Sequence, residues 1–216
     1  MEITIRPEQP KDYRKTEEIA REAFWNWFAP GCDEHYLLHS MRSNPDFVAP
    51  LSFVALQNNQ PIGVIAYAKA YIKTPALPLQ EILMFGPLCV LPACQRLGIG
   101  AALVRHSLQA TRQMGYSAVS IYGDPAYYRP LGFVPAKRFG IKTPNGNYLQ
   151  VLMVYPLHAN ALPALGGVLF ESPLYHVDAK KAAIFDQSFP VRQKQENLPS
   201  QKRFLQLVQD QIPFPE

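Results

Sequence analysis

The stretch from 87 to 108, PLCVLPACQRLGIGAALVRHSL, joins an apolar run to a helical pattern through a loop that contains Gly98 and Gly100. Backbone N–H groups at the start of a helix have no partners within the helix, and they all point the same way. Glycine at this place lets the oxygens of an anion approach the backbone, and the helix dipole favours negative charge. The spacing therefore predicts an anion site that suits a phosphate group.

Pro87, in the apolar run before this loop, is a second unusual feature. Proline cannot donate to a ladder, so the strand expected over 81–91 should bulge or lose a partner at Gly86-Pro87. Three residues would then offer backbone groups to an extended ligand, as in strand addition: Leu88, Cys89 and Val90. The spacing alone leaves open that the glycines serve only close helix packing. It excludes a dinucleotide GxGxxG fingerprint and a P-loop.

The composition of the 216 residues limits the class of protein to which the chain can belong. Apolar residues make up 48% and charged residues 18%, which is typical of a globular chain. The sequence contains neither a membrane-length apolar run nor the layout of a signal peptide, so we expect a cytoplasmic protein without a membrane partner. A net charge of +4 is too small and too dispersed to favour nucleic acid. Cys32, Cys89 and Cys94 lack disulfide or zinc spacing, so no metal is expected.

The surrounding sequence predicts the elements that position the loop. Apolar spacing predicts helices over 10–27, 33–41, 98–114 and 199–211, a short helix from Pro125, and strands over 3–6, 51–57, 62–72, 81–91, 117–123 and 148–155. The alternation from 79 to 123 is a β–α–β unit, and the hairpin around Asn58 and Asn59 makes the sheet mixed. We expect a domain over 1–158 and an extension over 159–216, packed on the domain or trailing from it.

Two motifs together resemble a known family. VLPACQRLGIGAALV is similar to the acetyl-CoA motif of the GNAT superfamily of N-acetyltransferases, Q/R-x-x-G-x-G/A after a V-x-P strand end, and YYRPLGF follows at the expected distance. The resemblance covers about residues 1–156, and it is strongest to bacterial predicted acetyltransferases with a C-terminal extension. It implies the GNAT fold, an α/β (α+β) architecture with a mixed, mostly antiparallel central sheet, a splayed strand and flanking helices.

The resemblance also implies how acetyl-CoA would bind as cosubstrate. Backbone groups of the splayed strand hold the pantetheine arm, which places it on Leu88, Cys89 and Val90. Backbone amides of the loop hold the pyrophosphate, which places it on Gln95, Arg96, Leu97, Gly98, Ile99 and Gly100, with Ala101 close by. The loop side chains are expected to be mostly incidental, although Arg96 could also meet a phosphate.

A tyrosine is the catalytic residue that the resemblance implies. Tyr128 occupies the family's Tyr-x-x-x-Gly-Phe position, where its phenol would protonate or hydrogen-bond the departing thiolate of CoA. Tyr127 is its rival, since adjacent helical residues point about 100° apart and one alone can face the sulfur. A purely packing role for both rings also stays open.

The base that deprotonates the acceptor is less well defined. Many family members carry a glutamate where this chain has Met84. Glu81 and Asp124 are the nearest carboxylates, but Glu81 suits a solvated strand end and Asp124 suits a helix N-cap. His35 and His39 could share a helical face, yet they lack the further ligands of a metal site. The N–H of Val90 could polarise the thioester carbonyl.

The acceptor would be bound by the segment AFWNWFAPGCDEHY, since the first helices wall the acceptor pocket in this fold. Phe24, Trp27 and Phe28 are expected in the core, while Trp25 could line a pocket. The expected function is an acyltransferase that acetylates a primary amine of a small molecule, peptide or protein by direct attack. The alternative is an inactive CoA-binding sensor or scaffold. Sheet-edge pairing would allow a homodimer.

Overall fold

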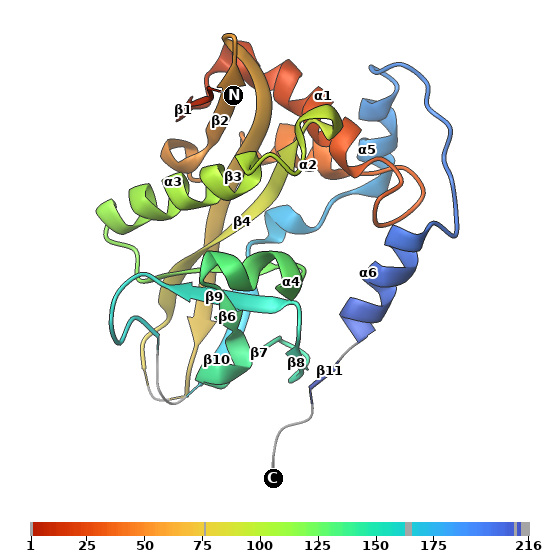
Figure 1. Cartoon of the computed structure of the whole chain (residues 1–216). Helices are drawn as coiled ribbons and strands as arrows, with labels where there is room; N and C mark the ends of the chain where they lie inside the picture. Colours follow the sequence, from red (N-terminus) through yellow and green to blue (C-terminus); the bar gives the residue numbers. More distant parts are fainter. Residues whose placement is uncertain (1, 76, 163–165, 210, 213–216) are drawn as a thin grey trace. The chain divides into compact units, whose positions relative to one another are not determined.

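A computed structural model describes residues 2–75, 77–162, 166–209 and 211–212 (Figure 1). Its helices are α1 Tyr13–Phe24, α2 Glu34–Met41, α3 Ile99–Gln113, α4 Pro125–Tyr128, α5 Ala179–Asp186 and α6 Pro199–Gln209. Its strands are β1 Thr4–Pro7, β2 Phe53–Gln57, β3 Gln60–Lys73, β4 Gln80–Val90, β5 Ala118–Tyr122, β6 Val134–Pro135, β7 Ile141–Lys142, β8 Tyr148–Leu149, β9 Leu152–Pro156, β10 Gly167–Glu171 and β11 Gln211–Ile212. Most predicted elements are thus confirmed within a few residues, and residue 210 of the predicted last helix lies outside the described residues.

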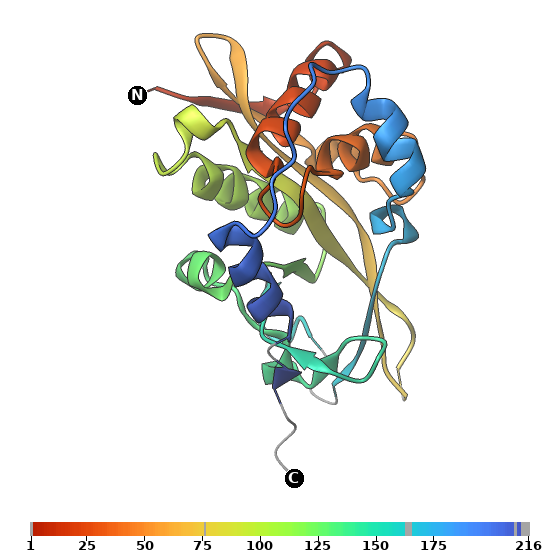
Figure 2. The same ribbon diagram turned by 90° about the vertical axis from the view of Figure 1, so that its right-hand side faces the viewer.

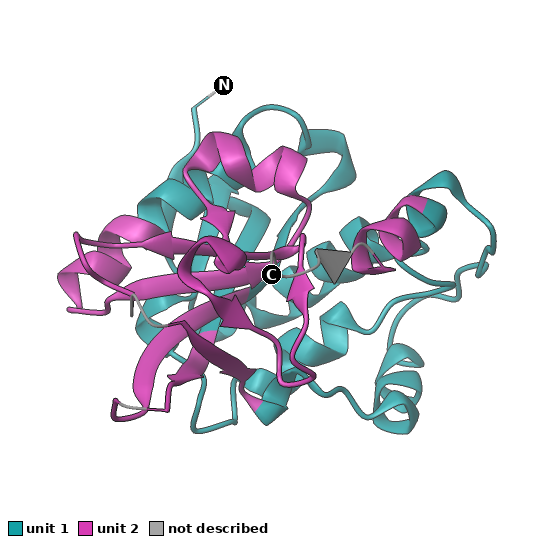
Figure 3. Ribbon diagram, turned by 90° about the horizontal axis from the view of Figure 1, so that it is seen from below, with its two compact units in different colours: residues 1–67, 86–107, 173–202 teal, residues 68–85, 108–172, 203–216 magenta. Residues whose placement is uncertain are grey.

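The chain divides into two compact units (Figure 3). Unit 1 comprises residues 1–67, 86–107 and 173–202, and unit 2 comprises residues 68–85, 108–172 and 203–216. Strands β3 and β4 and helix α3 each contribute residues to both units. No helix in the described part of the chain is both long enough and apolar enough to cross a membrane.

In unit 1, β1 and β2 pair antiparallel, and β2 continues into β3 through a tight hairpin. Asn58 and Asn59 supply its two left-handed residues, with φ of 49° and 62°, as a two-residue hairpin turn requires. Helices α1 and α2 pack against each other. The large side chains that are fully buried in this unit include Ile19, Leu38, Met41, Leu51, Ile65, Tyr67 and Ile99.

Helix α1 ends three residues earlier than its apolar spacing predicts. The chain leaves the helix after Phe24, and Asn26 adopts a left-handed φ of 61°. The apolar positions that follow therefore lose their helical alignment. The predicted core position of Trp27 was wrong, because its side chain is 52% exposed.

In unit 2, β4 pairs parallel with β5, while β5 with β9, and β9 with β6, pair antiparallel. The large side chains fully buried here include Phe85, Phe133, Ile72, Ile82 and Leu83. The one strand predicted over 148–155 is two strands, because β8 pairs with β11 in a separate two-stranded sheet. Strand β10 was not predicted, and it lies antiparallel to β3. The central sheet is mixed and mostly antiparallel, which confirms the predicted fold class.

Residues of the C-terminal extension also contribute to unit 1. Helix α5 packs against α2, and the Asp186 carboxylate lies 2.6 Å from Nε of Arg21 on α1. The ring of Phe185 lies 5.6 Å from that of His35 and 4.3 Å from that of His39, centroid to centroid. An ion pair and an aromatic cluster therefore attach α5 to the first two helices. The boundary proposed at residue 158 stays a prediction.

His35 should make the stability of the protein fall in mild acid. Its ring is fully buried, and burial lowers its pKa to about 4, although Asp186 lies 3.1 Å from Nε2. Between pH 6.5, the ordinary pKa of histidine, and about pH 4, the His35 ring binds a proton in the unfolded chain but not in the folded chain. Folding stability is therefore lost as the pH falls through this window. The full effect is about 3 kcal/mol.

The measurement is the free energy of unfolding by urea for the protein and for His35→Gln, at several pH values across this window. As the pH falls, the free energy of unfolding of the protein should decrease by about 3 kcal/mol relative to that of His35→Gln. His39→Gln, which removes an exposed histidine from the same helix, is the matched variant. A difference between the protein and His35→Gln that stays constant with pH would contradict the prediction.

Candidate active site

The start of α3 has the features of an anion site. The carbonyl of Gly98 accepts a hydrogen bond from the N–H of Ala102 at 2.9 Å, so Gly98 caps the helix. The helix itself therefore supplies no acceptor for the N–H groups of Ile99, Gly100 and Ala101. Gly98 has a left-handed φ of +81°, and a Cβ placed on it would meet no heavy atom within 4 Å. Its backbone is thus open to an approaching ligand.

The loop before the helix is tied back to β4 by a side chain. Nε2 of Gln95 donates to the carbonyl of Val90 at 3.1 Å. The side chain of Gln95 thus has a structural role in the loop, and the expectation that the loop side chains are mostly incidental to cosubstrate binding stays a prediction. Arg96 adopts a left-handed φ of 62°, and both Arg96 and Leu97 have exposed side chains. All the predicted cosubstrate-binding residues, 88–90 and 95–101, belong to unit 1.

Strand β4 directs alternate backbone groups toward and away from β3. The N–H of Leu91 donates to the carbonyl of Ile62 at 2.8 Å. Because backbone groups alternate along a strand, those of Cys89 face β3 as well, whereas those of Leu88 and Val90 face the opposite edge. A Cβ on Gly63 would lie 3.1 Å from the carbonyl oxygen of Cys89, so β3 and β4 approach each other closely at this glycine. Leu88 and Val90 are therefore the better placed of the three predicted contacts.

On that opposite edge the pairing of β4 is short. Its register with β5 in unit 2 consists of Leu83 with Val119 and Met84 with Ser120. Among the described residues the pairing does not continue to Gly86 and Pro87. This is the loss of a partner that a proline in the strand predicts.

Tyr128 lies in unit 2, in an aromatic cluster. Its side chain is 9% exposed, and its ring centroid lies 5.8 Å from that of Phe85 and 5.5 Å from that of Phe133. A Cβ on Gly123 would come within 2.1 Å of the Tyr128 ring, so the ring occupies the space that this glycine leaves. Tyr127 is 43% exposed. Of the two tyrosines, Tyr128 is thus the one whose ring is held in a fixed place.

Asp124 and Glu81, the two carboxylates considered as bases, both lie in unit 2, where each has a structural partner. Asp124 is the N-cap of α4, as expected, because its Oδ1 accepts from the N–H of Ala126 at 2.9 Å. Its Oδ2 lies 2.7 Å from Nη2 of Arg203. Glu81 is exposed and lies 3.7 Å from Nζ of Lys69. Met84 is 2% exposed. Both carboxylates thus have a cationic neighbour in this unit.

The loop between α1 and α2 forms an open pocket of about 170 Å³ in unit 1. Its lining residues are Phe24, Phe28, Ala29, Pro30, Gly31, Cys32, Asp33 and Glu34. The rings of Phe24 and Phe28 lie 5.7 Å apart. The lining residues are thus mostly apolar, with two acidic residues, and Trp25 is not among them.

The sequence model of the acetyltransferase (GNAT) family matches residues 20–133, more than half of the chain. The chain belongs to this family. The matched stretch contains the glycine loop at the start of α3, Tyr128 and the pocket loop. The resemblance inferred from two short motifs is therefore confirmed over a much longer part of the sequence.

Relatives and solved structures agree with this family. The Escherichia coli protein described as uncharacterized N-acetyltransferase YjhQ is 35% identical over 86 residues, which are 39% of this chain and 46% of YjhQ. This chain thus aligns with less than half of the length of YjhQ. Uncharacterized N-acetyltransferase YhbS, also from Escherichia coli, is 26% identical over 168 residues, covering 77% of this chain and 95% of YhbS.

Two solved structures of GNAT-family proteins have the same fold. The Escherichia coli YhbS structure, in complex with CoA, matches with a TM-score of 0.69 and 24% identity, covering 81% of this chain and 92% of YhbS. A GNAT family acetyltransferase from Brucella melitensis, in complex with acetyl-CoA, matches with a TM-score of 0.64 and 23% identity, covering 81% and 98%. At these identities the likeness shows the fold alone.

In this GNAT protein, the pocket loop is fixed by the C-terminal extension. Oδ1 of Asn26 accepts from the N–H groups of Gly31 at 2.8 Å and Gln195 at 3.1 Å, and its Nδ2 donates to the carbonyl of Gln193. Nε2 of Gln201 donates to the carbonyl of Asn26 at 3.1 Å. Figure 2 shows this segment of the extension, in blue, running past α1 and the loop that follows it. The extension therefore positions the pocket.

Trp25 also contributes to this attachment rather than to the pocket. Its Nε1 donates to the carbonyl of Gln193 at 3.0 Å. The guanidinium groups of Arg21 and Arg192 lie 4.3 and 5.6 Å from its ring centroid. Cation–π contacts of this kind contribute about 0.5–1 kcal/mol each at exposed sites. The suggested ligand role of Trp25 has no support in these contacts.

Asn26→Gly should loosen the pocket loop without disturbing the cosubstrate loop. Glycine tolerates the left-handed φ of Asn26, so the variant removes the three side-chain hydrogen bonds at little backbone cost. We expect the KM for an acceptor amine to rise about tenfold while the Kd for acetyl-CoA stays within about twofold. Steady-state kinetics and calorimetry measure the two constants. An equal loss of affinity for both ligands would contradict a local role.

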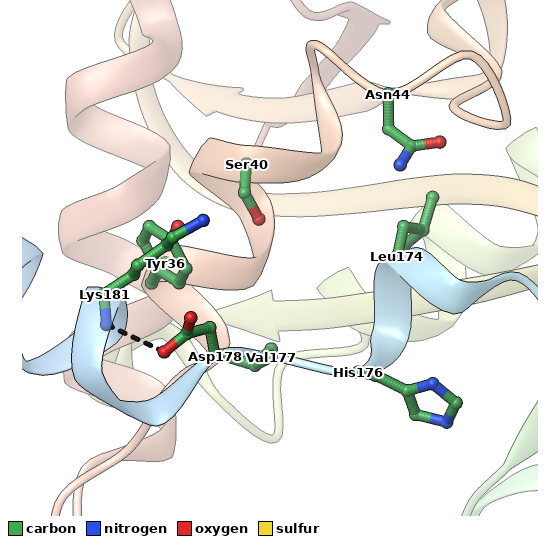
Figure 4. Close-up of a pocket in the computed structure, with 8 residues that line it drawn as sticks. All are labelled: Tyr36, Ser40, Asn44, Leu174, His176, Val177, Asp178 and Lys181. Atoms are coloured by element: carbon green, nitrogen blue, oxygen red, sulfur yellow. Dashed lines mark hydrogen bonds between the residues drawn. The ribbon is translucent and has the colours of Figure 1, made fainter.

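A second pocket, of about 190 Å³, lies between α2 and the extension within unit 1 (Figure 4). Its lining residues are Tyr36, Ser40, Asn44, Leu174, His176, Val177, Asp178 and Lys181. Asp178 caps α5, since its carboxylate accepts from the N–H groups of Lys180 and Lys181 at 2.9 and 3.2 Å. Tyr36, the last residue of the segment expected to bind the acceptor, lines this pocket, whereas the predicted catalytic and cosubstrate-binding residues do not.

The surroundings of two cysteines and two histidines favour structural roles for these residues. Burial raises the pKa of the Cys32 and Cys89 thiols, which keeps both protonated and unreactive at neutral pH. His35 and His39 lie beside different carboxylates, those of Asp186 and Glu17. Among the residues that the structure describes, no group of three or more metal-ligating side chains is assembled.

Proposed function

We propose that this GNAT-family protein is an N-acetyltransferase, which transfers the acetyl group of acetyl-CoA to a primary amine by direct attack. The observation that carries the proposal is the N-terminus of α3, where Gly98 leaves an open row of backbone N–H groups. Such a row suits a pyrophosphate. The CoA and acetyl-CoA in the two similar structures support the same ligand for this chain.

The proposed binding mode uses the backbone of unit 1. The amides of 95–101 hold the pyrophosphate, and the outward-facing groups of Leu88 and Val90 hold the pantetheine arm. The hydrogen bond from Gln95 to the Val90 carbonyl fixes the loop against the strand. That bond uses the carbonyl of Val90 and not its N–H. The N–H of Val90 would polarise the thioester carbonyl.

The proposed reaction forms a bond between the amine nitrogen and the carbonyl carbon, and breaks the bond between that carbon and sulfur. The protein mainly aligns the two reactants, which can account for a large part of the rate enhancement. The departing thiolate takes a proton from the phenol of Tyr128. Its confinement by Phe85, Phe133 and Gly123 supports this role, because a fixed ring costs little ordering in the transition state.

The experiment is the release of free thiol from acetyl-CoA in the presence of polyamines, amino acids, aminoglycosides, arylalkylamines and short peptides. The proposal predicts that at least one amine raises thiol release well above hydrolysis and gains one acetyl group by mass spectrometry. Acetyl-CoA binding without acetylation of any amine would leave a CoA-binding sensor or scaffold as the better description. Met84, at the position of the usual glutamate, is the observation that favours this second function.

A further inference from the structure

Arg203, on α6, contacts the residue that begins the helix of Tyr128. Its Nη2 and Nε lie 2.7 and 3.1 Å from Oδ2 of Asp124, so two donors of one guanidinium converge on one carboxylate oxygen. The planar guanidinium thereby fixes the direction of the contact as well as its length. Both residues, and all of α4, belong to unit 2. Arg203 comes from the C-terminal extension and has no role in the function described so far.

Helix α4 is too short to be stable by itself. It comprises the four residues Pro125–Tyr128, and an isolated helix of about one turn does not persist in water. Asp124 provides its attachment, since Oδ1 accepts from the N–H of Ala126 at 2.9 Å. The backbone carbonyl of Asp124 also accepts from the N–H groups of Tyr127 and Tyr128, at 2.9 and 3.1 Å. A displacement of Asp124 would therefore move the whole helix.

The ring of Tyr128 packs on the same turn of the chain. A Cβ placed on Gly123, the residue before the N-cap, would lie 2.1 Å from Cε2 of this ring. The N–H of Gly123 donates to the carbonyl of Val151 at 2.8 Å, which attaches the turn to the residue before β9. The phenol therefore takes its position from the main chain at residues 123 and 124. Arg203 holds the carboxylate at that place.

The segment that carries Arg203 is itself attached within unit 2. After α6, Gln211 and Ile212 form β11, which pairs antiparallel with β8. Strand β8 ends at Leu149, two residues before Val151, whose carbonyl binds Gly123. The extension thus contacts the surroundings of α4 at two places, through Arg203 and through β11.

The exposure of the ion pair determines which property it can affect. The side chains of Arg203 and Asp124 are 59% and 33% exposed, and exposed ion pairs contribute little to the stability of a protein. The position of a catalytic group is more sensitive, because a displacement of about 1 Å can cost about 100-fold in rate. The pair is therefore expected to change turnover more than stability.

We propose that Arg203 is a positioning residue for acetyl transfer, which acts through Asp124 and α4 to hold the Tyr128 phenol where it protonates the departing thiolate. The inference rests on the acetyltransferase function proposed above, and it gives the C-terminal extension a part in that function. The O–H bond of Tyr128 breaks together with the C–S bond, and the sulfur takes the proton. The amine nitrogen loses a proton as the amide forms, and this proton restores the phenol.

The test measures kcat by thiol release from acetyl-CoA, with the fastest-reacting amine of the panel named above. Arg203→Met keeps the aliphatic stem and removes the guanidinium. We expect kcat to fall about fivefold to tenfold while the Kd for acetyl-CoA stays within about twofold. Arg203→Lys keeps a cation and should recover part of the loss. Lys202→Met, which removes an exposed cation from the same helix, is the matched control and should leave kcat unchanged.

Two double variants test whether Arg203 acts through Asp124 and Tyr128. Asp124→Asn retains an oxygen for the N-cap and removes the charge, so it should lower kcat about as much as Arg203→Met does. The two substitutions together should lower kcat no further, because they remove the same contact. In Tyr128→Phe, where no phenol is left to position, Arg203→Met should change kcat by less than about twofold. A merely structural contribution of Arg203 would be equal in both backgrounds.

Hydrogen exchange of the α4 amides provides a readout that does not depend on activity. The N–H groups of Tyr127 and Tyr128 are bonded to the Asp124 carbonyl. Arg203→Met should therefore accelerate deuterium uptake of the peptide that contains them by about threefold or more, as measured by mass spectrometry. Lys202→Met should leave this uptake unchanged.

The possible results separate this inference from the function on which it rests. Unchanged kcat in Arg203→Met, with or without faster exchange, overturns the role of Arg203 while the acetyltransferase function stands. An equal loss of kcat on adding Arg203→Met to Tyr128→Phe does the same, since Arg203 would then act without the phenol. If no amine is acetylated, the acetyltransferase function fails and this inference fails with it.

Discussion

Gly98→Asp is expected to raise the Kd for acetyl-CoA by about 100-fold or more, which corresponds to about 3 kcal/mol. The new carboxylate would stand at the proposed pyrophosphate site, beside the first N–H groups of α3. The negative charges of the carboxylate and the pyrophosphate would repel each other, and the carboxylate would itself accept hydrogen bonds from the first N–H groups of α3. Aspartate tolerates the left-handed φ of +81° better than most residues, and a negative charge suits a helix N-terminus. The variant should therefore fold.

The opposite end of the same helix provides the control. Gly115 follows α3, has a φ of +84°, and has no heavy atom within 4 Å of a Cβ placed on it. Gly115→Asp thus shares the backbone strain, but its charge lies at the unfavourable end of the helix dipole. We expect Gly115→Asp to be the less stable variant by thermal denaturation and yet to bind acetyl-CoA normally by calorimetry. Equal loss of binding in both variants would mean that affinity merely follows stability.

Tyr128→Phe is expected to lower the turnover number about 100-fold while leaving the Kd for acetyl-CoA within about twofold. The substitution removes a hydroxyl and keeps the ring that packs against Phe85 and Phe133. The fold of the cluster should therefore survive, and the effect should appear in the chemical step. Rapid single-turnover kinetics separates that step from product release.

Tyr127→Phe is the matched variant for this prediction. Tyr127 is adjacent in sequence and carries the same hydroxyl, but its side chain is 43% exposed. We expect its turnover to stay within about twofold of the unmodified protein. If Tyr127→Phe lost the activity and Tyr128→Phe retained it, the proton donor would be Tyr127. An unchanged turnover in both variants would exclude both of these tyrosines as the proton donor.

The parts of the fold predicted from sequence are those with a strong local signal. The hairpin at Asn58 and Asn59, the helix after Gly98 and the N-cap at Asp124 all depend on residues close in sequence. Strand β10 was missed because its signal is a short apolar run, and its pairing with β3 is a contact between residues far apart in sequence. No local pattern encodes such a partner.

The candidate site was predicted unevenly for the same reason. The loop glycines and Tyr128 stand in spaced motifs. The helical face that placed Trp27 in the core failed because Asn26 ends the helix first.

The most direct test of the central claim is calorimetric titration of the protein with acetyl-CoA, and with acetyl-pantetheine, which lacks the pyrophosphate. The account predicts one acetyl-CoA site with a Kd of about 1–100 µM, and binding of acetyl-pantetheine that is at least about 100-fold weaker, because the loop at Gly98 would have nothing to hold. Equal affinity for the two ligands, or no binding of acetyl-CoA, would contradict it.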